Sequence, residues 1–170
     1  MSVRLTVRNH QRDLRVNLSL LRQITRALLR DYMKREHLEL GIHLVSDSEM
    51  VRLNETFLRH QGSTDVITFD YVEPAQQGLL SGEIFICCEE AVAQSRRFRT
   101  TWQSELIRYL VHGLLHLCSY DDRTAAKRRT MKAEENRLLG LLASRFSFTE
   151  LALMHRRRSP RRRGGVESRL

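Results

Sequence analysis

Two histidines, His112 and His116, lie four residues apart within the apolar segment Trp102–Cys118. That spacing on a helix places both imidazoles on one face, with their Cβ atoms about 5–6 Å apart. Two rings so placed can share one metal ion, with each nitrogen about 2.0–2.1 Å from it. In an apolar setting each ring otherwise needs its own hydrogen-bond partner, as a separately satisfied core histidine. The spacing alone leaves both interpretations open.

Two aspartates follow this segment. Asp122 lies six residues after His116, and a chain that turns back at the end of a helix can bring this carboxylate to the two rings. Asp122 is therefore a candidate third metal ligand. It also precedes the helical stretch 123–143, so the N-cap of that helix is an equal alternative. Asp121 is either a capping residue or an acceptor that orients a ligating histidine.

The residue directly after the first histidine is Gly113. Metalloproteases with an HExxH helix place a glutamate at this position as the general base. The glycine therefore argues against a metalloprotease, and any metal-activated water would need another base or would act without one.

The hydrophobic periodicity predicts the elements that position these residues. Alternating apolar residues indicate strands near residues 3–7, 38–44, 65–71 and 82–88. Helical spacing indicates helices over 20–32, 46–57, 89–98, 101–118 and 123–143, the second opened by a capping-box pattern at Ser46 and Glu49. We expect an α+β fold: a small four-stranded mixed sheet covered by about five helices, with a zinc-hydrolase-like HxxxH helix. The short link between the last two strands predicts an antiparallel pair.

Composition limits the class of protein. Of the 170 residues, 41% are hydrophobic and 29% are charged, which predicts one globular domain over residues 1–155. The histidine pair makes it a candidate metal-hydrolase domain. No apolar run reaches the ~18 residues of a membrane helix, and the first residues contain no apolar signal region. The three cysteines lack CxxC spacing, which favours a reducing, cytoplasmic compartment over a disulfide framework or a cysteine zinc site.

Most of the net charge of +9 lies at the C-terminal end. Residues 156–170 contain seven arginines and one glutamate, which accounts for six of these charges. This segment has almost nothing to bury, so we expect a disordered tail. The tail either lacks a function or attracts phosphate groups, those of nucleic acid before those of a membrane. Its candidate nucleic-acid-binding residues are Arg156, Arg157, Arg158, Arg161, Arg162 and Arg163.

Several segments together resemble one known family. The run from His112 to Asp122 (HGLLHLCSYDD) is similar to the signature of the YbeY family of bacterial endoribonucleases and rRNA maturation factors. Leu53-Asn54, followed by Thr64-Asp65-Val66 and Phe69, resembles a second family segment. Gly82-Glu83-Ile84 resembles the start of a family strand. The resemblance covers most of residues 40–145 in the family's order.

The resemblance implies a hydrolase that holds one zinc ion through three side chains and cuts single-stranded RNA. It also implies a role in maturing the 3′ end of small-subunit rRNA and in ribosome quality control. By position, His112 and His116 become zinc ligands, and Asp122 replaces a third ligand that is usually histidine. A carboxylate is an ordinary zinc ligand, but its charge makes the ion a slightly weaker Lewis acid. Two histidines and one carboxylate also suit other divalent metals, including iron.

Two further positions depart from the family pattern. Ser119 replaces the family glycine at the turn, and a serine tolerates a positive φ less well. The family arginine in the loop after the asparagine aligns with Leu58, and Arg59 lies one residue further on. Arg59 is a candidate contact for a substrate phosphate, with a solvated charge at a helix end as the alternative.

We therefore expect a zinc-dependent endoribonuclease, with rRNA of the small ribosomal subunit as its substrate and a small-subunit ribosomal protein as a partner. One alternative is a non-catalytic ribosome-assembly factor whose metal is structural, with Cys118 or His155 as a fourth ligand. Another is a metallohydrolase of a different substrate, such as a peptide or amide. Because aromatic residues make up only 6% of the chain, we expect RNA recognition through shape and charge without a base-stacking platform.

Overall fold

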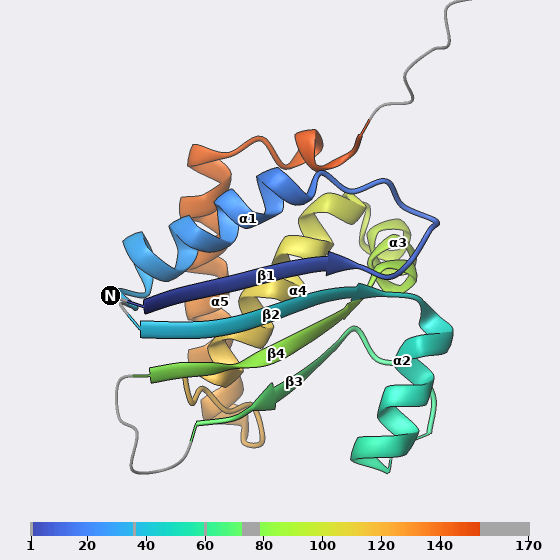
Figure 1. Ribbon diagram of the computed structural model, residues 1–170, viewed down its shortest axis with the longest axis horizontal. Helices are drawn as coiled ribbons and strands as arrows, with labels where there is room; N and C mark the ends of the chain where they lie inside the picture. The colour runs from blue at the N-terminus through green and yellow to red at the C-terminus, as the bar shows by residue number, and fades with distance from the viewer. Residues whose placement is uncertain (1, 36, 60, 73–78, 154–170) are drawn as a thin grey trace, which may run out of the picture.

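The computed structural model describes residues 2–35, 37–59, 61–72 and 79–153 (Figure 1). The arginine-rich segment 156–170 lies outside these residues. Within them, no helix combines the length and the apolar character that crossing a bilayer requires.

A four-stranded mixed sheet forms the centre of the fold. Its strand order is β1-β2-β4-β3, in which β1, β2 and β4 run parallel and β3 runs antiparallel to β4. The expected mixed sheet and its antiparallel pair are therefore confirmed. The strands are β1 (Ser2–Asn9), β2 (His37–Val45), β3 (Val66–Asp70) and β4 (Leu79–Cys87).

Three helices lie on one face of this sheet (Figure 1). They are α1 (Leu18–Ala27), α4 (Trp102–Leu117) and α5 (Ala125–Arg145). Helix α4 packs on β3 and β4, and α5 packs on α4. Two further helices follow the parallel strands directly: α2 (Asp47–Leu53) after β2, and α3 (Cys88–Phe98) after β4. Single π-helical turns, Leu28–Tyr32 and Asn54–Leu58, extend α1 and α2.

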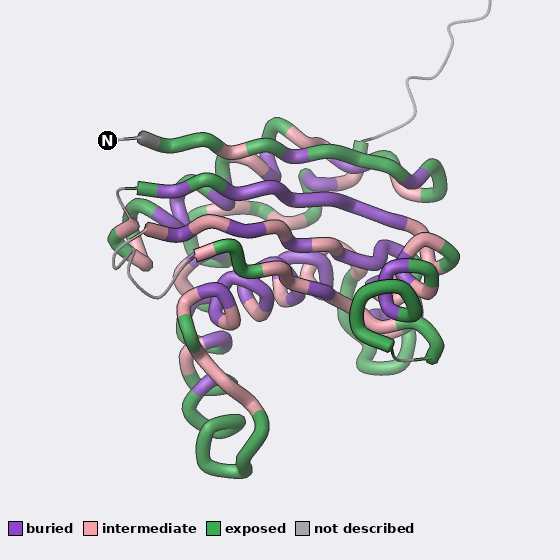
Figure 2. The backbone as a smooth tube through the Cα atoms, turned by 60° about the horizontal axis from the view of Figure 1, so that its bottom comes forward, coloured by how far each residue is buried: buried purple, intermediate pink, exposed green. Residues whose placement is uncertain are grey.

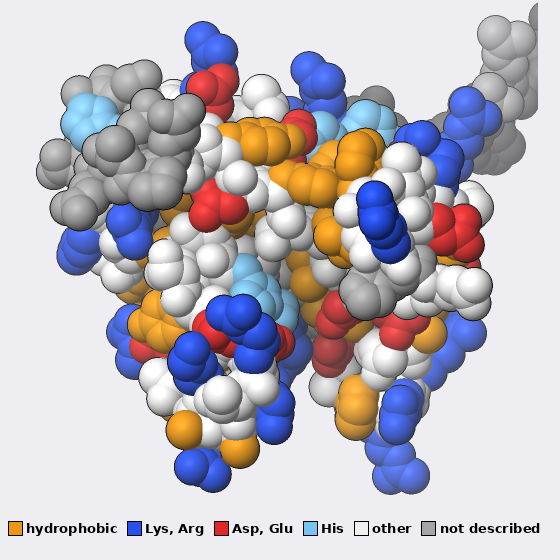
Figure 3. All heavy atoms as spheres, turned by 90° about the horizontal axis from the view of Figure 1, so that it is seen from below, with side chains coloured by type: hydrophobic (Ala, Val, Ile, Leu, Met, Phe, Trp, Pro, Cys, Tyr) orange, Lys and Arg blue, Asp and Glu red, His pale blue; other side chains and the backbone are white. Residues whose placement is uncertain are grey.

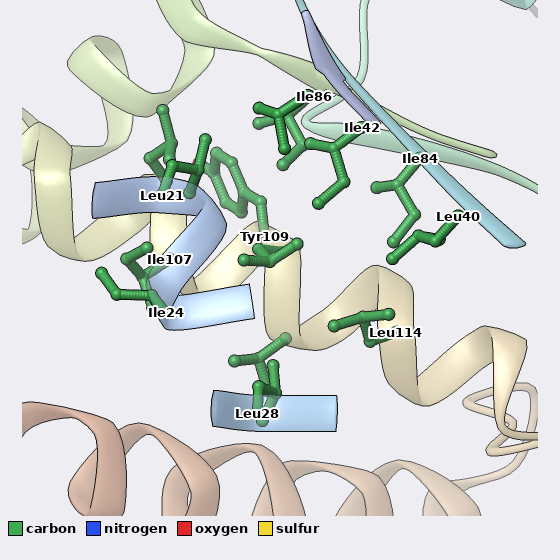
Figure 4. Close-up of a cluster of buried hydrophobic side chains, with 14 of the residues drawn as sticks. Leu21, Ile24, Leu28, Leu40, Ile42, Ile84, Ile86, Ile107, Tyr109 and Leu114 are labelled. Carbon is green, nitrogen blue, oxygen red and sulfur yellow. The ribbon is translucent and has the colours of Figure 1, made fainter. Parts of the chain in front are cut away.

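The core lies between the sheet and these helices. Alternate residues of β2 and β4 point to the helix side, where they meet apolar side chains of α1 and α4 (Figure 4). Burying each such side chain stabilises the fold by about 1.5–3 kcal/mol. Figure 2 shows buried residues in the central strands and in the helices packed on them, α4 above all, whereas residues 123–130, at the start of α5 and just before it, are exposed.

Gly113 lets α4 lie close to the sheet. A Cβ atom at this position would be 2.9 Å from Cγ2 of Ile84 on β4 and 3.2 Å from Cγ2 of Thr68 on β3. Helix–sheet packing therefore requires a glycine at this position. The close approach that it allows places the histidine-bearing turns of α4 beside the β3 edge of the sheet.

Candidate metal centre

Helix α4 brings the two histidines together as their spacing predicts. The Nε2 atoms of His112 and His116 are 3.0 Å apart, and the ring planes make an angle of 82°. Both side chains are nearly one-third exposed. The two nitrogens therefore face one another at the surface of α4, where a ligand from solvent can reach both.

Hydrogen bonds on the far side of each ring fix where the protons lie. His112 Nδ1 is 3.0 Å from the Glu135 carboxylate, and His116 Nδ1 is 3.2 Å from the carbonyl oxygen of Tyr120. Both partners can only accept, so each Nδ1 carries the proton and donates it. In the neutral rings both Nε2 atoms then present lone pairs to one another. A cation bound by both nitrogens relieves that repulsion, so this donor set fits a divalent metal ion.

The exit of α4 supplies the third candidate ligand. Ser119 has a left-handed backbone with φ of 68°, as its position in the turn led us to expect. The backbone N–H groups of Ser119 and Tyr120 donate to the carbonyls of His116 and Leu115, which is the Schellman pattern of a helix end. This turn reverses the chain and carries Asp122 Oδ2 to 3.8 Å from His116 Nε2.

Three candidate ligand atoms consequently cluster together. One ligand atom from each of His112, His116 and Asp122 lies within 4.8 Å of the other two. The alternative role for Asp122, as the helix N-cap, is wrong. Thr124 caps α5, because its hydroxyl accepts from the Lys127 N–H.

Asp121 lies on the basic side of the same turn. Its carboxylate accepts hydrogen bonds from the Arg123 side chain and backbone and from Lys127. These bonds, those of the Arg123 side chain first, hold the pKa of Asp121 well below its usual range. The structure thus places Asp121 against two cations, and the acceptor that orients His112 is a different residue.

That acceptor, Glu135, was missed in the sequence. Its side chain is only 4% exposed, and its second oxygen accepts from Arg108 and Lys132 at 2.7 Å each. Burial opposes its ionisation, but hydrogen bonds from His112, Lys132 and Arg108 outweigh burial and lower the pKa of Glu135 to about 2. One signal was available: Glu135 occupies an otherwise apolar helical stripe, whose other members are Met131, Leu138 and Leu142.

A cavity of about 370 Å³ opens beside His112. Three cations contribute to its wall: Arg108, Arg128 and Lys132. Figure 3 shows a histidine group in a hollow of this face, bordered by acidic and basic side chains. The full set of lining residues is Asp65, Arg108, Tyr109, His112, Asp122, Arg128, Met131, Lys132 and Glu135.

Several other predicted site residues lie elsewhere. Arg59 does not line this cavity; it ends the π-helical turn after α2, with a left-handed φ of 54°. Cys118 is not a member of the three-residue cluster, and burial raises the pKa of its thiol. His155 and the six tail arginines fall outside the described residues.

Two imidazoles and a carboxylate beside a cation-lined cavity, on an α+β fold, define a candidate metal-hydrolase centre. Comparison with known proteins agrees with a hydrolase. The family model described as endoribonuclease YbeY matches residues 6–143, and the chain belongs to that family.

Individual relatives span much of the chain. Endoribonuclease YbeY of Bacteroides fragilis is 38% identical over 103 residues, which cover 61% of this chain and 72% of the relative. Endoribonuclease YbeY of Azobacteroides pseudotrichonymphae is 33% identical over 130 residues, which cover 74% of this chain and 91% of the relative. A Thermotoga maritima protein solved in solution shares the fold, with a TM-score of 0.59 and 24% identity over 82% of this chain and 89% of that one.

Proposed function

We propose that this protein is a metal-dependent endoribonuclease that cleaves single-stranded RNA at the cavity beside His112. Membership of the endoribonuclease YbeY family supports the nuclease activity. The observation that carries the metal requirement is the pair of facing Nε2 atoms, 3.0 Å apart, with both Nδ1 protons already donated elsewhere.

His112, His116 and Asp122 would hold the ion, which we propose to be zinc, although this ligand set also accepts other divalent metals. When bound, such an ion supplies Lewis acidity toward a phosphodiester and its attacking oxygen. Glu135 keeps the His112 proton on Nδ1 and thereby leaves Nε2 free as a ligand.

The cations of the cavity wall would receive the RNA backbone. Arg108 on α4 and Lys132 on α5 reach the cavity, and both donate to the buried Glu135 carboxylate. Arg128 lines the cavity from the preceding turn of α5. Positive charge at this place neutralises phosphate oxygens and holds the scissile bond near the candidate ligands. Arg59 would contact a more distant phosphate of the same strand.

The biological setting forms part of the same proposal. We place the substrate in rRNA, at the 3′ end of the small-subunit RNA, with a further role in ribosome quality control. The small ribosomal subunit, including one of its proteins, would be the partner, and the cytoplasm the compartment.

Cleavage of a labelled single-stranded RNA by the zinc-loaded protein tests the activity. We expect the wild type to cut, and His112→Ala to lose cleavage because one of three ligands is gone. His37→Ala, at an exposed histidine that begins β2, is the matched control and should cut normally. Equal cleavage by the two variants would place any nuclease activity away from this centre.

A further inference from the structure

The sheet face opposite α1, α4 and α5 carries an unexpected row of rings. Neighbouring centroids are 5.5 Å apart for Phe57 and Phe69, 5.8 Å for Phe69 and Phe85, 4.5 Å for Phe85 and His43, and 5.3 Å for His43 and His10. The five rings come from five separate segments and cross the sheet from the turn after α2 to the end of β1. We call this set the aromatic row.

Hydrogen bonds hold one end of the row in place. Glu83 accepts from Tyr71 Oη at 2.6 Å and lies 3.1 Å from His43 Nε2, so that nitrogen carries a proton. His43 Nδ1, 3.0 Å from His10 Nε2, is then the acceptor for the proton of His10. His43 is thereby fixed between the parallel rings of His10 and Phe85. A surface whose rings are already ordered loses little entropy when a ligand stacks on it.

The two ends of the row are accessible. Phe57 is 59% exposed and His10 is exposed, whereas His43 is buried and Phe69 and Phe85 are half-buried against the small core beneath α2. Tyr71, joined to the row through Glu83, is 55% exposed. Arg8, on β1, is close enough to act electrostatically on His43. In the view of Figure 3, hydrophobic and histidine side chains gather along the upper part, with charged groups beside them. A narrow row with an exposed phenylalanine at one end and an arginine near its histidines suits stacked bases and phosphates better than it suits the broad apolar face of a protein.

The row is continuous with the candidate metal centre across a single edge strand. Asp65, directly before β3, lines the cavity beside His112, whereas Phe69, within β3, belongs to the row. Four residues of extended strand span about 13 Å. A single-stranded RNA that leaves the cavity over the β3 edge would therefore reach Phe69 and Phe57 after crossing about this distance.

We propose that the aromatic row is an RNA-binding subsite, where bases flanking the scissile bond stack on Phe57 and its neighbours. This inference rests on the proposed function, because it assigns the row to the same single-stranded substrate. The subsite adds base stacking to RNA recognition, which the low aromatic content had led us to expect through shape and charge alone. A second copy of this chain or a protein partner is the competing occupant.

Phe57→Ala tests the subsite, and Phe98→Ala on α3 is its matched control, since the two phenylalanines are 59% and 61% exposed. The probe is a fluorescent oligouridine of about twelve nucleotides, a length within the range that single-strand sites occupy. Anisotropy in EDTA measures binding without cleavage. Loss of one stacked base should weaken binding about tenfold in Phe57→Ala, and Phe98→Ala should bind as the wild type does.

Two further measurements separate the possible outcomes. With zinc, Phe57→Ala should raise the KM of cleavage and leave kcat unchanged, and 4-thiouridine in the probe should crosslink within residues 57–71. Equal RNA affinity of the two variants, crosslinks confined to the cavity, or a change of oligomeric state in Phe57→Ala alone would each overturn the subsite. A wild type that binds the probe through the row yet never cuts RNA would instead overturn the proposed function.

Discussion

Glu135→Gln isolates the contribution of a buried charge to the proposed metal binding. One oxygen of Glu135 accepts from His112, and the other accepts from both Arg108 and Lys132. A glutamine offers one acceptor and one donor, so it leaves either the histidine or the two cations without an acceptor. The substitution preserves volume, and any effect therefore reports on hydrogen bonding and charge.

We expect Glu135→Gln to weaken zinc binding about 10–100-fold, or ~1.4–2.8 kcal/mol, the usual range for a partner that orients a metal-binding histidine. The upper part of this range is favoured because the carboxylate is only 4% exposed and water cannot replace it. Competition with a chromophoric zinc chelator measures the dissociation constant.

The neighbouring glutamate provides the control. Glu134 lies on the same helix and forms its own ion pair with Arg137 at 2.6 Å, away from the histidines. Glu134→Gln removes the same charge and should leave zinc affinity nearly unchanged. Equal losses in the two variants would show that only net charge matters, and no loss in Glu135→Gln would refute its orienting role.

Acid unfolding of the zinc-free protein gives an independent readout. The pKa of Glu135 is lowered from 4.5 to about 2 in the folded state, so its contribution to stability is present above pH 4.5. That contribution is lost as the pH falls from about 4.5 to about 2. Glu135→Gln should therefore flatten the pH dependence of the free energy of unfolding in this window, and an unchanged curve would contradict the assignment.

Three further predictions concern the turn, the helix packing and the tail. Ser119→Gly should relieve a left-handed residue and stabilise by about 1 kcal/mol, raising Tm by about 2–4 °C, whereas Ser19→Gly within α1 should lower it. Gly113→Ala adds a methyl that would meet an isoleucine at 2.9 Å, so urea unfolding should show a loss of about 1–3 kcal/mol. Gly140→Ala, in open space on α5, should instead gain about 1 kcal/mol. Deleting residues 156–170 should weaken RNA binding and flatten its salt dependence, and an unchanged slope would leave the tail without that role.

Features that depend on local sequence were predictable. The four-residue spacing of His112 and His116 fixes their common helix face whatever the rest of the chain does. Strand alternation likewise predicted the strands, and the short link between the last two predicted their antiparallel pairing. The capping residue Ser46 was also identified, since its hydroxyl accepts from the Glu49 N–H.

Features that depend on contacts between distant parts of the chain could not be predicted from the sequence. Glu135 reaches His112 only because α5 folds back along α4, and no pattern within either helix specifies that pairing. The cap of α5 fell on Thr124, which freed Asp122 for the histidines. A low overall aromatic content likewise gave no indication that strand register would line up Phe69, Phe85 and His43.

The candidate metal-ligand cluster and the carboxylate that orients His112 all belong to one helical hairpin, from α4 through the Ser119 turn to α5. Their sequence separations are short, so little chain entropy opposes bringing them together. This hairpin can therefore assemble its ion site early in folding, before the parallel strands find their distant partners. An ion present during synthesis would then act as a nucleating agent, and the refolding rate of the protein should rise with zinc concentration.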